Sequence, residues 1–216
     1  TALAQFDTAM FVSDVFLLDN YIKRQNNGIN FKDTKTYRGT PYNNPNFLPG
    51  NIYKEGTLLA DNIAIRYNAV ADEMEVKQTL SSNDENARVL TKSQDIYVKI
   101  IEDIYVFVPY QGGVENGGYF QVIFEGSKTA LYKKHIKDFK PEKKATSSIT
   151  KTLPPVFKDK PVFYLVTKSG KFYQMPKSRS KKLKVFGEKQ NQMKAFTKQN
   201  NLDLNKIGRA HDWTPV

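Results

Sequence analysis

The chain has 216 residues, of which 39% are hydrophobic and 12% are aromatic, with 14 Phe and 12 Tyr. This composition is enough for one sizeable core and favours β-sheet, because aromatic and β-branched side chains pack well on a pleated surface. The chain contains no Cys, which excludes disulfides, thiolate nucleophiles and Cys-based metal sites.

The net charge of +11 is concentrated in the C-terminal part of the chain. Residues 1–130 contain 12 Lys and Arg against 16 Asp and Glu, a net charge of −4, whereas residues 131–216 contain 21 against 6, a net charge of +15. Lys outnumbers Arg there and lacks the planar fork that recognises base edges, so specific nucleic-acid recognition is disfavoured. A solvated lysine-rich surface and a non-specific attraction to phosphates are the two remaining interpretations.

The N-terminus matches a short export signal. Ala2-Leu3-Ala4 has small residues at the two positions that signal peptidase recognises, so we expect cleavage before Gln5, with residues 1–4 as a signal-peptide remnant. The apolar run at residues 9–21 fits either a strand–turn–strand unit or one short helix, and its Phe and Val content favours strands. The sequence has no uninterrupted apolar run of about 18 residues, so we expect no membrane-spanning helix.

Residues 39–78 combine dense turn chemistry with the longest strand pattern. Three Pro and three Asn within residues 39–50 predict an ordered loop that leads into a strand. A tight hairpin turn is predicted at residues 54–57, where Gly56 can take a positive φ. Between residues 63 and 76 the side chains alternate, with Ile65 and Tyr67 on one face and Arg66 on the other, which predicts a sheet with one buried face.

The acidic group Asp72, Glu73 and Glu75 has two interpretations. Paired carboxylates can act as a general acid and base, but charges on a solvated strand edge are the commoner arrangement. The two histidines, His135 and His211, have no second ligand at metal-binding spacing. We therefore expect no catalytic residues, no metal and no cofactor. Removal of any of these carboxylates or of His135 is predicted to change stability only modestly, because each is expected to be solvated.

The remainder of the chain predicts a β-meander and a helical tail. Strands are expected at residues 96–101, 104–110 and 119–125, a surface linker at 140–160, and a hairpin over 161–175. A glycine-rich loop at 111–118 binds phosphate when a helix follows it, but here a strand follows. Ser178 or Ser180 can cap a helix that Gly187 interrupts, and a second helix continues to residue 200. Their apolar residues, Phe186, Met193 and Phe196, are expected to be buried on the sheet.

We therefore predict a mainly β protein: an antiparallel β-meander, sandwich-like or partly open barrel domain with a C-terminal helical tail. Residues 5–49 form an N-terminal segment and a Pro/Asn-rich loop, residues 50–175 the antiparallel β domain, and residues 176–216 a basic helical tail packed on it. Together they are predicted to form a single domain.

Several motifs resemble a secreted, β-rich family of Bacteroidetes. They are GTPY at 39–42, Phe47 and Gly50, the strand IAIRYNAVADEMEVK at 63–77 with its Arg-Tyr-Asn and Asp-Glu-x-Glu elements, and the basic helical pair of the tail. The chain departs from the family pattern after Leu204. The family includes the plug of the type IX secretion translocon. The resemblance implies a non-enzymatic periplasmic protein, monomeric outside the complex, that closes the periplasmic opening of a large outer-membrane β-barrel.

The predicted contacts with that barrel come from the basic tail, through Lys181, Lys182, Lys184 and Lys189. The alternative hypothesis is a periplasmic or surface β-domain that binds another ligand, such as lipopolysaccharide or a glycan. Nucleic acid is not an expected partner.

Overall fold

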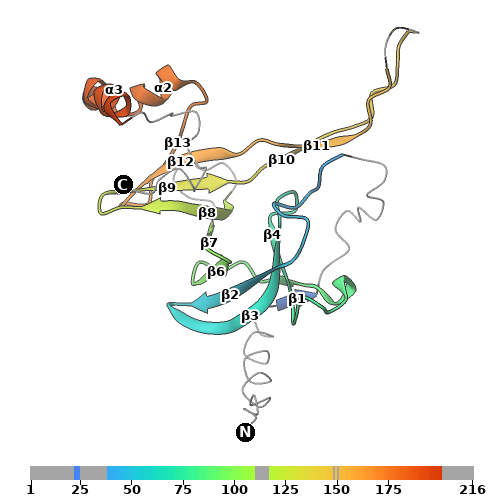
Figure 1. Cartoon of the computed structure of the whole chain (residues 1–216). Helices are drawn as coiled ribbons and strands as arrows, with labels where there is room; N and C mark the ends of the chain where they lie inside the picture. Colours follow the sequence, from blue (N-terminus) through green and yellow to red (C-terminus); the bar gives the residue numbers. More distant parts are fainter. Residues whose placement is uncertain (1–21, 25–37, 110–116, 148, 150, 201–216) are drawn as a thin grey trace, which may run out of the picture.

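The computed structural model describes residues 22–24, 38–109, 117–147, 149 and 151–200 (Figure 1). Eleven strands form one sheet in the order β1-β5-β4-β3-β2-β6-β7-β8-β9-β12-β13, and β10 pairs with β11 as a separate ribbon. Every pairing between these strands is antiparallel. The predicted mainly β, antiparallel fold is confirmed. The predictions for residues 1–4, 9–21 and 205–216 concern residues outside the described part of the chain.

The strands are β1 (Ile22–Arg24), β2 (Leu48–Lys54), β3 (Thr57–Asn68), β4 (Glu73–Lys77), β5 (Arg88–Leu90), β6 (Ile96–Ile100), β7 (Asp103–Val108), β8 (Gly118–Glu125), β9 (Thr129–Lys134), β10 (Lys137–Lys140), β11 (Val156–Asp159), β12 (Val162–Thr167) and β13 (Phe172–Gln174). A short 3-10 helix, η1 (Asp84–Asn86), connects β4 to β5.

Tight turns determine the order of the strands. The β2–β3 turn places Glu55 and Gly56 at φ of 49° and 83°, the left-handed pair that matches the twist of a two-residue hairpin. The β12–β13 hairpin turns at Gly170, with φ of 75°. Both hairpins were predicted, and both are confirmed. Register shifts in the β2–β3 pairing bend these strands, and Figure 1 shows their strong curvature.

Two apolar clusters form the core. The larger lies along β2 to β7 and includes Ile52, Ile65, Met74 and Val98, none of which is exposed to solvent. The smaller lies on β8, β9, β12 and β13 around Phe120, whose ring centroid is 5.4 Å from that of Phe172. The sheet therefore divides its apolar residues between an N-terminal and a C-terminal half.

Residues 140–160, predicted to be a surface linker, form strand only at their two ends, at Lys140 in β10 and at Val156–Asp159 in β11. Between these ends the described residues lie outside the named strands, apart from one bridge between Lys143 and Leu153, and most are exposed, as expected of a surface linker. We call residues 136–160 the arm; it contains β10 and β11 and projects away from the sheet (Figure 1). It continues the β9–β12 pairing, because the Lys160 amide donates to the Ile136 carbonyl at 2.9 Å. The prediction missed the paired ends because Phe139 and Phe157, whose ring centroids are 4.9 Å apart, are adjacent only after pairing.

The helical tail comprises α2 (Arg179–Lys184), η2 (Gly187–Lys189) and α3 (Gln190–Gln199). Ser178 caps α2 by accepting a hydrogen bond from the Lys181 amide, and Gly187 interrupts the helix at φ of 53°, both as predicted. The predicted burial of Phe186, Met193 and Phe196 is wrong: the first two are half-buried and Phe196 is 50% exposed.

The reason lies in the packing of the tail, since the main contacts of α2 and α3 are within the tail and any contacts with a strand are minor. The buried residues of the described tail are Lys182, Leu183 and Thr197. No helix in the described part of the chain has the length and apolarity required to cross a membrane.

Candidate functional site

The first candidate site is the Arg-Tyr-Asn strand with its acidic partner. The guanidinium carbon of Arg66, on β3, lies 3.8 Å from the ring centre of Tyr42 and 4.1 Å from that of Phe47. Its Nε and Nη2 donate to Glu75 Oε2 at 3.0 and 2.7 Å, and its Nη1 donates to the Pro45 carbonyl at 3.2 Å. Glu75, opposite on β4, has no solvent exposure.

Arg66 thereby holds the Pro/Asn-rich loop against the second face of β3. Phe47 from that loop packs with Ala64 of β3 and with Ala87 in a small buried cluster. The prediction of a sheet with only one buried face is therefore wrong at β3. The loop was predicted from its turn residues, but nothing in the alternation of β3 indicated that it folds back over this strand.

Lys77 forms a related site at the end of β4. Its amino group donates to the carbonyls of Leu80 and Ser82 at 3.2 and 2.7 Å and to Asp84 Oδ1 at 2.7 Å. It also lies 4.5 Å from the centre of the Phe47 ring. Lys77 is only 7% exposed, so its charge is used to fix the β4–β5 connection.

Asp72 connects three strands that are distant in sequence. Its Oδ1 accepts hydrogen bonds from the Tyr67 hydroxyl at 2.6 Å and from the Tyr119 amide at 3.1 Å, and it forms an ion pair with Lys134 at 3.0 Å. A Cβ on Gly118 would overlap the Asp72 carboxylate, so the close approach requires glycine. Asp72 therefore joins β3 to β8 and β9.

The predicted solvated strand edge is wrong for this acidic group. β4 lies between β3 and β5 rather than at an edge of the sheet. Glu75 is fully buried, the Asp72 side chain is 22% exposed and Glu73 is half-buried. The carboxylates are occupied by structural contacts because the strands that meet at β4 bring basic and hydroxyl groups to them.

His135 lies in a cluster of tyrosines where β9 leads into the arm. Its ring centre is 6.0 Å from those of Tyr67 and Tyr105, and its Nε2 donates to Gln121 Oε1 at 2.7 Å. Burial, reinforced by Lys133 and neighbouring lysines, lowers the pKa of His135 to about 3. His135 is 7% exposed, so the expectation of a solvated side chain is wrong.

The same burial raises the pKa of the Tyr67 hydroxyl, and the adjacent Asp72 carboxylate raises it further. Burial also raises the pKa of Tyr105 and Tyr119. At neutral pH the three tyrosines and His135 are therefore neutral. A general acid or base works best with a pKa near the working pH, and the pKa values of these four rings lie far from it. Among the described residues, no group of three or more His, Asp or Glu could hold a metal ion.

A groove of about 390 Å3 lies over the C-terminal half of the sheet. Its surface is shared almost equally between apolar and polar atoms, the polar ones coming from residues that include Gln94, Glu125, Thr167 and Lys168. Ligand-binding pockets are usually lined mainly by apolar side chains with a few polar groups, so this open groove is more polar than most. The apolar lining residues include Val106, Val108, Ala130, Tyr132, Val166 and Phe172.

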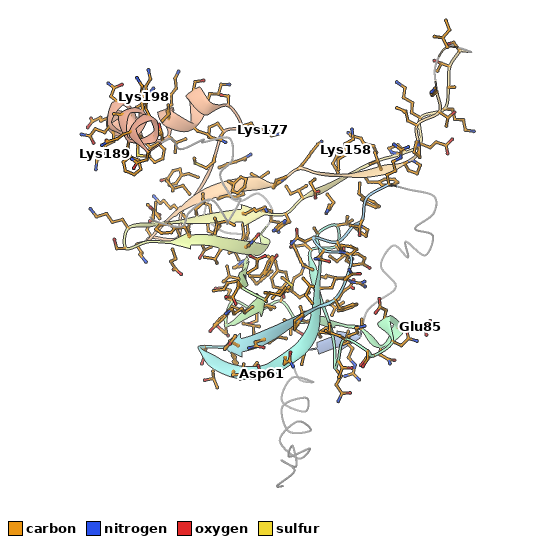
Figure 2. All side chains as sticks on the ribbon, viewed as in Figure 1. Asp61, Glu85, Lys158, Lys177, Lys189 and Lys198 are labelled. Carbon is orange, nitrogen blue, oxygen red and sulfur yellow. The ribbon has the colours of Figure 1, made fainter. Side chains whose placement is uncertain are left out.

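The predicted partner-binding lysines do not all face solvent. Lys181, Lys184 and Lys189 are exposed, whereas Lys182 is only 9% exposed; it lies beside Leu183, so the buried side of α2 includes it. Residues 177–198 contain eight Lys and Arg against one Glu, a net charge of +7. Figure 2 shows Lys177, Lys189 and Lys198 distributed around this helical tail.

The arm is a functional candidate that sequence reasoning missed. Its outer part, residues 143–153, contains three Lys and no Asp or Glu, and Ile149 at its end is 92% exposed. One signal could have revealed the ribbon: Phe139 and Phe157 lie nine positions either side of residue 148, so a hairpin centred there pairs them directly.

Comparison with protein-family models, with curated proteins and with solved structures finds no match.

Proposed function

We propose that this is a non-enzymatic periplasmic protein that binds and closes the periplasmic opening of a large outer-membrane translocon barrel of type IX secretion. The observation that supports the proposal is the basic helical tail. The tail has a net charge of +7 within residues 177–198. The main contacts of its helices are made within the tail rather than with the sheet. A charged surface of this kind speeds association and keeps the complex sensitive to salt.

Binding is favoured over catalysis because the ionisable residues that could do chemistry have structural partners. Glu75 is paired with Arg66, Asp72 with Lys134 and two tyrosines, and neutral His135 with Gln121. These interactions hold strands together, which is the usual role of buried and paired charges.

The motif residues that carry the resemblance to the Bacteroidetes family belong to these structural sites. Tyr42, Phe47, Arg66 and Glu75 are neighbours around one guanidinium group. The resemblance thus supports a shared architecture, and the partner must be recognised by other surfaces. We assign that role to the exposed lysines of the tail, Lys181, Lys184 and Lys189, with the protein monomeric before it binds.

A tagged pull-down from detergent-solubilised outer membranes tests the proposal. We expect the wild type to retain a very large barrel protein and a Lys181→Gln/Lys184→Gln/Lys189→Gln variant to lose it. A matched control, Lys143→Gln/Lys144→Gln/Lys151→Gln, removes the same charge from the arm and should still bind. Failure of the wild type to capture a barrel, or equal capture by the tail variant, would contradict the proposal.

A second candidate function is binding of another ligand, such as lipopolysaccharide or a glycan, in this groove. The groove volume of about 390 Å3 and the nearby Lys168 favour it. Titration with purified lipopolysaccharide distinguishes the two functions. If the groove binds the ligand, Ala130→Trp, which places a large side chain in the groove, should abolish lipopolysaccharide binding. The same variant should still capture the barrel through its tail.

A further inference from the structure

The arm is firmly anchored at its root. Residue 38 pairs with β11, since the Arg38 amide donates to the Pro155 carbonyl at 2.8 Å and the Phe157 amide donates to the Arg38 carbonyl at 2.9 Å. Gly39 passes so close that an added Cβ would lie 2.6 Å from the Phe157 carbonyl oxygen. His135, which precedes the arm, is buried among tyrosines. The root is therefore a fixed base from which the ribbon projects.

Charge is distributed unevenly along the arm. Near the root three of the four lysines are ion-paired: Lys137 pairs with Asp159 at 2.6 Å, and Lys140 and Lys160 pair with Asp138. The fourth, Lys158, is exposed and forms no ion pair with a described residue. Farther out, Lys143, Lys144 and Lys151 are exposed, and no carboxylate among the described residues forms an ion pair with any of them. The uncompensated positive charge is thus greatest in the outer part.

The same outer part exposes aliphatic side chains. Ile149 is 92% exposed and Leu153 is 57% exposed. The ribbon keeps its pairing there, because Lys143 and Leu153 exchange backbone hydrogen bonds at 3.0 and 2.8 Å and the Ala145 amide donates to Thr152 Oγ1 at 3.1 Å. A bridged pair of segments that exposes aliphatic residues beside lysines has the chemistry of an interfacial anchor.

We propose that the end of the arm, formed by Lys143, Lys144, Ile149, Lys151 and Leu153, docks on an anionic phospholipid membrane. Ile149 and Leu153 enter the headgroup region, and the three lysines contact lipid phosphates. This site is separate from the basic tail and does not depend on the proposed barrel partner.

Two features favour a membrane over other acidic partners. The described end of the arm contains neither Arg nor an aromatic residue, whereas nucleic-acid sites use both for phosphate forks and base stacking. The arm also carries its end well away from the sheet (Figure 1). Its end can therefore reach a flat surface while the sheet stays clear of it.

Co-sedimentation with lipid vesicles tests this inference. We expect the full chain to bind vesicles of phosphatidylcholine with about one-third phosphatidylglycerol, and to bind pure phosphatidylcholine much more weakly. Each lysine near such a surface contributes about fivefold, so Lys143→Gln/Lys144→Gln/Lys151→Gln should weaken binding about 100-fold. The matched tail variant, Lys181→Gln/Lys184→Gln/Lys189→Gln, should change it less than roughly threefold, because those charges are not held at the surface.

Insertion is tested separately from charge. Ile149→Ser/Leu153→Ser should weaken binding about tenfold without altering its salt dependence, since only apolar contacts are removed. The native chain has no Cys, so an NBD fluorophore on Ile149→Cys reports this position alone. It should gain blue-shifted fluorescence on anionic vesicles, and the same label on Ser169→Cys, in the β12–β13 turn, should not.

Four results would overturn the inference: no binding of the wild type to anionic vesicles, equal binding to neutral ones, equal losses in the arm and tail variants, or an unchanged NBD spectrum at position 149. Urea midpoints equal to that of the wild type would show that the variants are folded. Because the pull-down of the barrel uses the tail variant, failure of one proposal leaves the other standing.

Discussion

Glu75→Gln is the most direct test of the Arg66 site. The substitution keeps the shape of the side chain but removes its charge, leaving the Arg66 side chain, which is 11% exposed, with only the exposed Asp84 carboxylate at 3.5 Å as an ionic partner. Removing one partner of a buried ion pair costs about 3–5 kcal/mol, because the remaining charge stays buried without compensation. The Pro45 carbonyl and the rings of Tyr42 and Phe47 still contact Arg66, so we expect a loss of about 3 kcal/mol in the free energy of unfolding.

Urea denaturation followed by near-UV circular dichroism measures this loss. The control is Glu85→Gln, which makes the same chemical change at an exposed position in η1 (Figure 2) and should stay within about 0.5 kcal/mol of the wild type. A domain of this size unfolds with about 5–15 kcal/mol in total, so the Glu75 effect is a large fraction and is readily resolved.

A double variant separates the ion pair from its surroundings. Arg66→Met/Glu75→Leu removes both charges together, and it should be less destabilised than the sum of the single variants, since neither charge is left unpaired. If Glu75→Gln unfolds at the same urea concentration as Glu85→Gln, Arg66 does not hold the Pro/Asn-rich loop as described, and the interpretation of the motif as structural is refuted.

Three further predictions concern other parts of the fold. The pKa of His135 is depressed from 6.5 to about 3 in the folded protein. Its contribution to stability is therefore fully present above pH 6.5 and is lost as the pH falls toward 3. His135→Phe should make the free energy of unfolding decline less steeply over that pH range. Gly39→Ala, at φ of 78° and with its Cβ 2.6 Å from a carbonyl oxygen, should cost about 2–4 kcal/mol. Gly170→Ala, at φ of 75° and with no atom within 4 Å, should cost only about 1 kcal/mol; equal unfolding midpoints for these two variants would show that the close contact of Gly39 does not matter. Phe120→Ala, fully buried, should cost about 3–5 kcal/mol in thermal or urea unfolding, whereas Phe196→Ala, 50% exposed, should cost less than about 1 kcal/mol, and the reverse order would place the tail on the sheet after all.

Local signals predicted the local structure. The turn at Glu55–Gly56 and the hairpin around Gly170 depend on backbone conformations that few residues adopt, so the sequence identifies them directly. The cap at Ser178 and the break at Gly187 follow the same logic. Each of these features depends on residues within about five positions of one another, which is the range over which a sequence pattern has a single structural meaning.

The sites could not be predicted because their partners are distant in sequence. Asp72 and Lys134 are 62 positions apart, and they meet only because β8 brings its first residue, Gly118, to the β3–β4 turn. An Asp-Glu-x-Glu segment has the same composition whether its carboxylates face water or a buried arginine. Alternation along β3 correctly identified the inner face around Tyr67, but it contained no information about which loop covers the outer face.

These long-range contacts also limit what the resemblance implies. The motif residues with the clearest pattern, from Tyr42 to Glu75, stabilise the fold through Arg66, so a chain can keep them while its partner changes. Specificity must then come from surfaces that the fold does not need, and the two most basic ones, the helical tail and the outer arm, make few contacts with the sheet. Exchanging three lysines for glutamine in either place alters charge without touching a core residue, which is why paired variants can assign a partner to each surface independently.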